Sequence, residues 1–201
     1  MQAVLLWVDR INTWIGQAFA WSIIALTLVV SYEIVMRTLF RAPTGWAFDW
    51  SYILYGALFM MAGAYTLARN GHVRGDFLYR NFPIKVQAAL DMLLYFLFFF
   101  PGILAFMYFG YKFAHLSWLI NERSMFSPSG PLLWPFKALI PLAGATLLAQ
   151  GIAEVVRCAI TIRTGVWPER LHDVEETEKL ILEQAQAQAE ADARAARGVS
   201  Q

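Results

Sequence analysis

Residues 33–83 read EIVMRTLFRAPTGWAFDWSYILYGALFMMAGAYTLARNGHVRGDFLYRNFP. The stretch has a charged border, an apolar run and a second charged border, which is typical of a chain that crosses a bilayer and turns. No Asp, Glu, Lys, Arg or His occurs from Trp50 to Ala68. At about 1.5 Å of rise per residue, this run covers most of a hydrocarbon core roughly 30 Å thick. We therefore predict a transmembrane helix at about residues 50–69.

Three more apolar runs, each with its charges near the ends, occur at about 17–36, 88–111 and 138–162. The 201 residues are 58% hydrophobic and 15% charged, with a mean hydropathy of +0.46. Such a chain would be hard to keep soluble around a single core. The sequence thus predicts an all-α integral membrane protein with four transmembrane helices in one domain, residues 1–165. The net charge of +1 gives no indication of a nucleic-acid partner.

The two ends of the chain differ from these spans. Apolar residues recur at helical spacing over residues 3–15, which predicts an amphipathic helix lying in the membrane interface. The alternative is a simple extension of the first span. Residues 166–201 are rich in Glu, Gln and Ala with a thin apolar face, so we expect a tail that is partly helical or disordered.

Orientation follows from the Lys and Arg residues near the span ends, because cytoplasmic loops carry more of them. The side with the N-terminus, the 69–85 connection and the chain after the fourth span carries eight, and the opposite side carries five. Both termini and the tail are therefore expected in the cytoplasm.

The span interiors offer little for catalysis. Ionisable groups inside a membrane are costly and usually functional, yet the middles of the four predicted spans lack them. His72, His115 and His172 lie at unrelated depths, and Cys158 is alone, so neither a bis-histidine haem nor a cysteine-rich metal site is expected. We expect no enzyme activity, no cofactor and no metal in this chain.

Two charge pairs admit two interpretations. Glu33 and Arg37 are four residues apart, and Glu154 and Arg157 are three apart, spacings at which opposite charges meet on a helix. Local pairing that lowers the cost of charge at the membrane edge is the simpler one. Contact with charges of another subunit is the alternative.

Small residues form stripes on the second and fourth spans, and such stripes let helix backbones approach closely in lipid. They do not indicate whether the neighbouring helix belongs to this chain or to another protein. The members are Gly56, Ala57, Gly63 and Ala64 on the second span, and Ala145, Ala149 and Ala153 on the fourth.

Residues at the borders of the spans resemble a known family. They are Arg37 with Phe40 and Pro43, Trp46 followed by Asp49, Gly63-Ala64, Arg69, Gly71-His72-Val73, Asp76 and Pro83, and later SPSGPLLWPFKALIPLAG over residues 127–144. Over residues 13–165, their order relative to four spans is similar to the small membrane subunit (DctQ type) of tripartite ATP-independent periplasmic (TRAP) transporters. Asp49 stands where the family usually has Glu.

The resemblance implies a secondary transporter with three parts, in a bacterial inner membrane. A periplasmic solute-binding protein captures an organic acid, a large elevator-type membrane subunit carries it with sodium, and this small subunit braces the large one in the lipid bilayer. Sodium coupling would reside in the large subunit. Two other functions remain open: a membrane anchor subunit of a respiratory or redox enzyme, and a small transporter that works by self-association.

The connection over residues 115–135 is the longest on the predicted periplasmic side. Its apolar residues favour packing against the large subunit, with the charged pair Glu122 and Arg123 at the rim. The alternative is docking of the solute-binding protein, in which these two charges would take part.

Overall fold

The computed structural model describes residues 2–71, 79, 81–127 and 130–171. His72, Asp76 and nearly all of the predicted tail lie outside the described residues. Met1–Pro168 form one compact unit, and Glu169–Gln201 form another. Everything below concerns the first unit.

All regular elements in the described part of the chain are helices, as predicted. They are α1 (Gln2–Ala20), α2 (Ser22–Thr38), α3 (Ala47–Ala68), α5 (Ile84–Leu94), a π-helix η1 (Tyr95–Phe99), α6 (Phe100–Leu119) and α7 (Trp134–Thr164). Four helical runs are long and apolar enough to cross a membrane: Gln2–Thr38, Ala47–Ala68, Ile84–Leu119 and Trp134–Thr164. The four-span fold class is thus confirmed, although the first and third runs extend well beyond the predicted apolar stretches.

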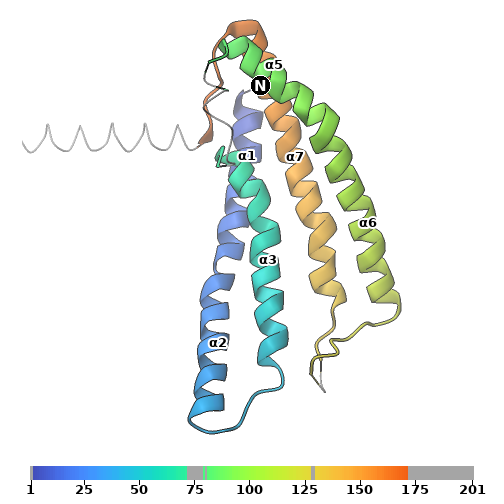
Figure 1. The fold of residues 1–201 in the computed structure, drawn as a ribbon. Helices are drawn as coiled ribbons and strands as arrows, with labels where there is room; N and C mark the ends of the chain where they lie inside the picture. Colours follow the sequence, from blue (N-terminus) through green and yellow to red (C-terminus); the bar gives the residue numbers. More distant parts are fainter. Residues whose placement is uncertain (1, 72–78, 80, 128–129, 172–201) are drawn as a thin grey trace, which may run out of the picture. The chain divides into compact units, whose positions relative to one another are not determined.

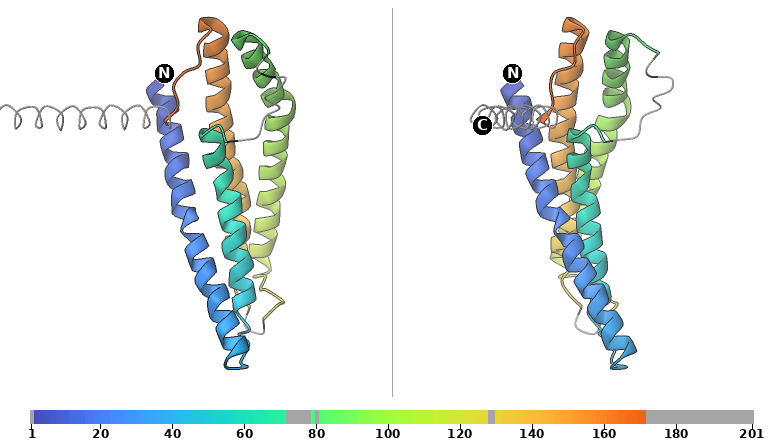
Figure 2. Two further views of the ribbon diagram at one scale, coloured as in Figure 1. Left: turned by 60° about the vertical axis from the view of Figure 1, so that its left-hand side comes forward. Right: turned by 90° about the vertical axis from the view of Figure 1, so that its left-hand side faces the viewer.

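The central helices are α3 and α7, which pack on each other (Figure 1). The α1–α2 run packs on α3, and the run from α5 to α6 packs on α7. Only α1 of the first run also contacts α7 substantially. Figure 2 shows the start of α1 at the same end of the bundle as the end of α7, with the α2–α3 turn at the opposite end. Each outer run therefore leaves much of its surface uncovered.

The first helix places its polar face inward. Its buried residues include Asp9, Asn12 and Thr13, whereas Trp7 and Trp14 are exposed. The helix continues almost directly into α2 and lies along α3, where a Cβ on Gly16 would come within 2.5 Å of Tyr65 Cβ. This packing corresponds to the extension of the first span. The interfacial position expected for residues 3–15 is not supported by it.

Small residues let α6 and the helices before it approach α7 closely. A Cβ added to Gly110 would lie 2.5 Å from Ile140 Cγ2, and one added to Gly151 would lie 2.2 Å from Phe99 Cε1 in η1. Glycine at such positions brings two backbones together where lipid provides no hydrophobic drive. Gly102, on the same helix as Gly110, has nothing within 4 Å of its would-be Cβ.

These two glycines provide a matched test of the packing. Gly110→Ala should lower the free energy of unfolding by about 1–3 kcal/mol, because the added methyl group overpacks the contact with Ile140. Gly102→Ala should raise it by up to about 1 kcal/mol, because alanine is the better helix former and meets no neighbour. Unfolding by detergent titration measures both changes. Equal effects of the two substitutions would contradict the packing of α6 on α7.

Candidate functional site

A buried polar network joins α1 to α7. Arg157 is its centre: Nη2 lies 2.5 Å from Asp9 Oδ2, and Nη1 lies 2.6 Å from Glu154 Oε1. Gln150 Nε2 donates hydrogen bonds to Asp9 Oδ1 at 2.9 Å and to Glu154 Oε1 at 3.2 Å. Asn12 Nδ2 donates to Gln150 Oε1 at 2.8 Å. We call Asp9, Asn12, Gln150, Glu154 and Arg157 the polar network.

Helical spacing explains why these side chains meet. Asp9 and Asn12 are three residues apart on α1, while Gln150, Glu154 and Arg157 follow one another at steps of four and three on α7. Each set lies on one face of its helix. All five residues are at most 2% exposed, and a buried charge is tolerated only when paired and hydrogen-bonded.

The pairing of Glu154 with Arg157 is confirmed, but the sequence interpretation missed its main partner. Asp9 belongs to residues 3–15, for which an interfacial helix is the first expectation and an extension of the first span is the alternative. In the structure the polar face of this helix meets α7, so the fourth span has buried ionisable groups with a partner from α1. The signal available in the sequence was the set Asp9, Asn12 and Gly16, which shares one helical face.

At the opposite end, a carboxylate holds the loop between α6 and α7. Asp49 is fully buried in the first turn of α3 and accepts hydrogen bonds from the hydroxyl groups of Ser124 and Ser127. A negative charge is favourable at a helix N-terminus. We call Asp49, Ser124 and Ser127 the loop clasp. It fixes residues far along the chain to the start of the second span.

The two predicted rim charges also contribute to this loop. The backbone of Arg123 forms an isolated antiparallel β-bridge with that of Leu132. The Arg123 side chain donates a hydrogen bond from Nη1 to the Gly130 carbonyl oxygen at 3.2 Å. Glu122 pairs with Lys137 Nζ at 2.5 Å, and the hydrogen bond from Lys137 lowers the pKa of the Glu122 carboxyl below its usual range. Both side chains therefore stabilise the fold of the loop. Their part in docking the binding protein stays a prediction.

The family-like border residues in the described part of the chain lie at helix ends. Arg37 pairs with Glu33 at 2.6 Å, and Glu33 also accepts from the Thr44 backbone N–H at 2.9 Å, which closes the α2–α3 turn. Trp46, just before α3, stacks on Tyr32 with ring centroids 5.8 Å apart. Arg69, just after α3, lies 4.9 Å from the centroid of the Tyr65 ring. These contacts shape the turns, and the predicted local pairing of Glu33 with Arg37 is confirmed.

The predicted small-residue stripes divide into two groups. A Cβ on Gly56 would meet Phe136, and one on Gly63 would meet Leu147, so both glycines face α7 within this chain. Ala57, Ala64 and Ala153 are buried as well. Ala145 and Ala149 on α7 are exposed.

Among the described residues, no group of three or more His, Cys, Asp or Glu side chains is arranged to hold a metal ion. His115 stacks on Tyr111 with centroids 5.7 Å apart. The polar groups described above act on one another and on nearby backbone. Together, these contacts hold α1 against α7 and hold the loops to the helix ends.

Breaking the polar network should destabilise the bundle strongly. Arg157→Leu removes the buried guanidinium that both carboxylates contact, which should cost about 3–5 kcal/mol of the free energy of unfolding. The matched control is Arg37→Leu, because the Arg37 side chain is 66% exposed in its pair with Glu33. That change should cost about 1 kcal/mol or less. Detergent unfolding compares the two variants, and similar small losses would show that the network contributes little.

The Glu122–Lys137 pair should give a pH dependence of defined sign. Because the folded protein lowers the pKa of Glu122 below its ordinary 4.5, the pair stabilises the fold fully above that value. Its contribution is lost as the pH falls through the lowered pKa. Glu122→Gln should remove this acid-side loss, so the wild-type advantage over the variant should shrink below pH 4.5. Parallel stability profiles would argue against the pair.

Comparison with known proteins agrees with this architecture. A search of curated proteins gave no match. The family described as tripartite ATP-independent periplasmic transporters, DctQ component, matches residues 26–161, which include α3, α6 and most of α2 and α7. That range also holds the loop clasp and the α7 part of the polar network. The chain belongs to the DctQ component family of tripartite ATP-independent periplasmic transporters.

Proposed function

We propose that this chain is the small membrane subunit that braces the large, elevator-type subunit of a TRAP transporter. The large subunit would import an organic acid with sodium, after delivery by a periplasmic solute-binding protein. The observation that carries the proposal is membership of the DctQ family, since the family is one of transporter components. The following features of the bundle support the role of a brace.

The polar network and the loop clasp bind charged side chains within the described part of the chain. Arg157 pairs with Asp9 and with Glu154, and Asp49 accepts hydrogen bonds from two serines. A carrier needs polar groups that bind and release a solute along a pathway, whereas a brace needs fixed helices. These contacts favour the brace.

The exposed face of α7 is suited to another transmembrane helix. Leu142 and Ile152 are 49% and 52% exposed, and the exposed Ala145 and Ala149 lie between them. The steps of three, four and three residues form one stripe, with small residues at its centre and larger apolar ones at its ends. We propose that this α7 seam, Leu142, Ala145, Ala149 and Ile152, contacts the large subunit.

We propose that the spans cross a bacterial inner membrane and that both termini lie in the cytoplasm. It rests on the excess of Lys and Arg on the side that carries the N-terminus and the end of α7. The loop clasp would then lie at the periplasmic surface, on the side from which the solute-binding protein arrives.

Large side chains on the α7 seam should block assembly without unfolding the bundle. Ala145→Trp combined with Ala149→Trp should sharply reduce the large subunit that co-purifies with this chain, and should reduce sodium-driven uptake in proportion. The matched control is Ala18→Trp combined with Ala20→Trp, two exposed alanines on α1. Thermal stability in detergent serves as the folding check for both variants.

Two results would contradict parts of this proposal. Failure of the wild-type chain to co-purify with any large multi-span protein would count against the brace itself. Full assembly and uptake by the α7 variant would exclude the seam and leave another face as the contact.

A further inference from the structure

The outer face of α1 carries an arginine between two tryptophans. Trp7 and Trp14 are 63% and 70% exposed, and Arg10, three residues after the first and four before the second, is exposed as well. Steps of three and four residues place the three side chains on one side of the helix. The opposite side of α1 holds Asp9 and Asn12 in the polar network. We call Trp7, Arg10 and Trp14 the outer triad.

The charge of Arg10 is not balanced within the described part of the chain. No carboxylate there pairs with its guanidinium group. The neighbouring Asp9 lies on the other side of α1, where Gln150 and Arg157 bind its two carboxylate oxygens. A guanidinium group presents its N–H donors in a planar fork that matches carboxylate and phosphate oxygens. Arg10 is therefore suited to bind an anion from outside the bundle.

Charged residues on the central helices mark two membrane edges. Asp49 in α3 and Arg69 just after it are twenty positions apart, and Lys137 and Arg157 in α7 are also twenty apart. Twenty residues rise about 30 Å, which is the thickness of a hydrocarbon core. Because Asp49 and Lys137 lie at the loop-clasp end, Arg69 and Arg157 mark the opposite edge. We call this level the arginine edge.

The outer triad lies at the arginine edge. Asp9 Oδ2 is 2.5 Å from Arg157 Nη2, so the adjacent Arg10 is at nearly the same depth. Along α1, Trp7 is about 4.5 Å farther out than Arg10, and Trp14 is about 6 Å farther in. Side chains lean toward the N-terminus of their helix, which is outward in α1. Both indoles therefore lie near the headgroup level, which tryptophan prefers.

The size of the triad side chains favours lipid over a second helix. Transmembrane helices pack closely where small residues let their backbones approach. The outer triad instead presents two indoles and a guanidinium group. Fluid lipid adapts to such protruding side chains, and its headgroups supply the acceptors that indole N–H groups need at a membrane interface.

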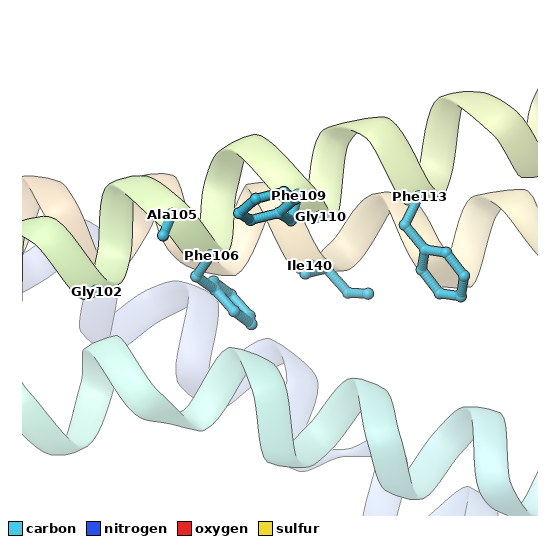
Figure 3. A pocket seen from close by; sticks show the side chains of 7 residues that line it. All are labelled: Gly102, Ala105, Phe106, Phe109, Gly110, Phe113 and Ile140. Atoms are coloured by element: carbon cyan, nitrogen blue, oxygen red, sulfur yellow. The ribbon is translucent and has the colours of Figure 1, made fainter.

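The open groove on α6 lacks any comparable selectivity. It has a volume of about 640 Å³, and the residues that line it, labelled in Figure 3, are all apolar. An apolar wall accepts apolar chains of any kind. The α1 face differs because it combines a charge with a defined depth in the membrane.

We propose that the outer triad binds the headgroup of an anionic phospholipid in the leaflet at the arginine edge. Arg10 donates hydrogen bonds to the phosphate oxygens, and the indole rings of Trp7 and Trp14 pack beside the glycerol region and the upper acyl chains. Cations at this level attract anionic lipids. The site belongs to this chain alone, and it does not rest on the role of the chain as a brace.

The test measures lipid retained by the purified full-length chain in detergent with equal amounts of phosphatidylglycerol and phosphatidylcholine of identical acyl chains. Native mass spectrometry counts both lipids, and the wild type should retain more phosphatidylglycerol. Arg10→Gln should lower the ratio of phosphatidylglycerol to phosphatidylcholine by about fivefold, as expected for one arginine near a lipid surface. Trp7→Leu combined with Trp14→Leu should reduce retention of both lipids. Thermal stability in detergent is the folding check, and it should be unchanged because all three side chains are exposed.

Each change has a matched control. Arg41→Gln removes an exposed arginine from the α2–α3 turn, at the other end of the bundle. Trp21→Leu removes a tryptophan that is 71% exposed but lies about 16 Å deeper along the chain than Arg10. Neither should alter the lipid count or ratio as the triad variants do. The proposal is overturned if Arg10→Gln leaves the ratio unchanged or if either control has the same effect as its triad counterpart. It is also overturned if the triad variants remove a co-purifying protein chain instead of lipid.

Discussion

The bundle depends on Arg157 lying fully buried between carboxylates from two helices. The guanidinium group contacts Asp9 of α1 and Glu154 of α7, and each of the three side chains is at most 3% exposed. A charge in such a place is stable only with its partners in position, because a buried charge is costly unless it is paired and hydrogen-bonded. The first and last helices must therefore come together for either to be stable. Since α3 packs on both, its position follows from theirs.

The described helices place polar groups inward at the ends and small or apolar residues along the middle. On α1, the exposed side carries tryptophans and the buried side carries Asp9 and Asn12. In lipid this inversion costs little, because the apolar side has a favourable solvent and the polar side has hydrogen-bond partners. Ionic contacts thus fasten one end, the loop clasp fastens the other, and close glycine contacts fill the distance between them. Helices fastened in this way are suited to the proposed role of a brace.

The sequence predicted the number and type of the spans because a long apolar run has few alternatives to a membrane helix. The ends of the runs were harder to predict: the first run begins at Gln2 instead of about residue 17, since the polar side chains of α1 pair inside the bundle instead of ending a helix. The network itself was only half predicted. Neighbours three or four residues apart, such as Glu154 and Arg157, can be read from the sequence, whereas Asp9 is 148 positions away. Trp7 and Asp9 lie on opposite faces of α1. This pattern fits a helix whose polar face meets water and a helix whose polar face meets protein equally well.

The central claim is that α1 is held against α7 within the bundle. Spin labels at Ile11→Cys and Ala159→Cys, with Cys158→Ser to remove the buried native thiol, permit the α1–α7 distance to be measured in lipid bilayers by pulsed electron resonance. The account predicts one narrow distribution at the short separation of two packed helices. It also predicts that the distribution broadens when Asp9→Asn is added, since the ion pair with Arg157 is then lost. A broad or long distribution in the protein with Asp9 intact, as for a helix lying freely on the membrane surface, would contradict it.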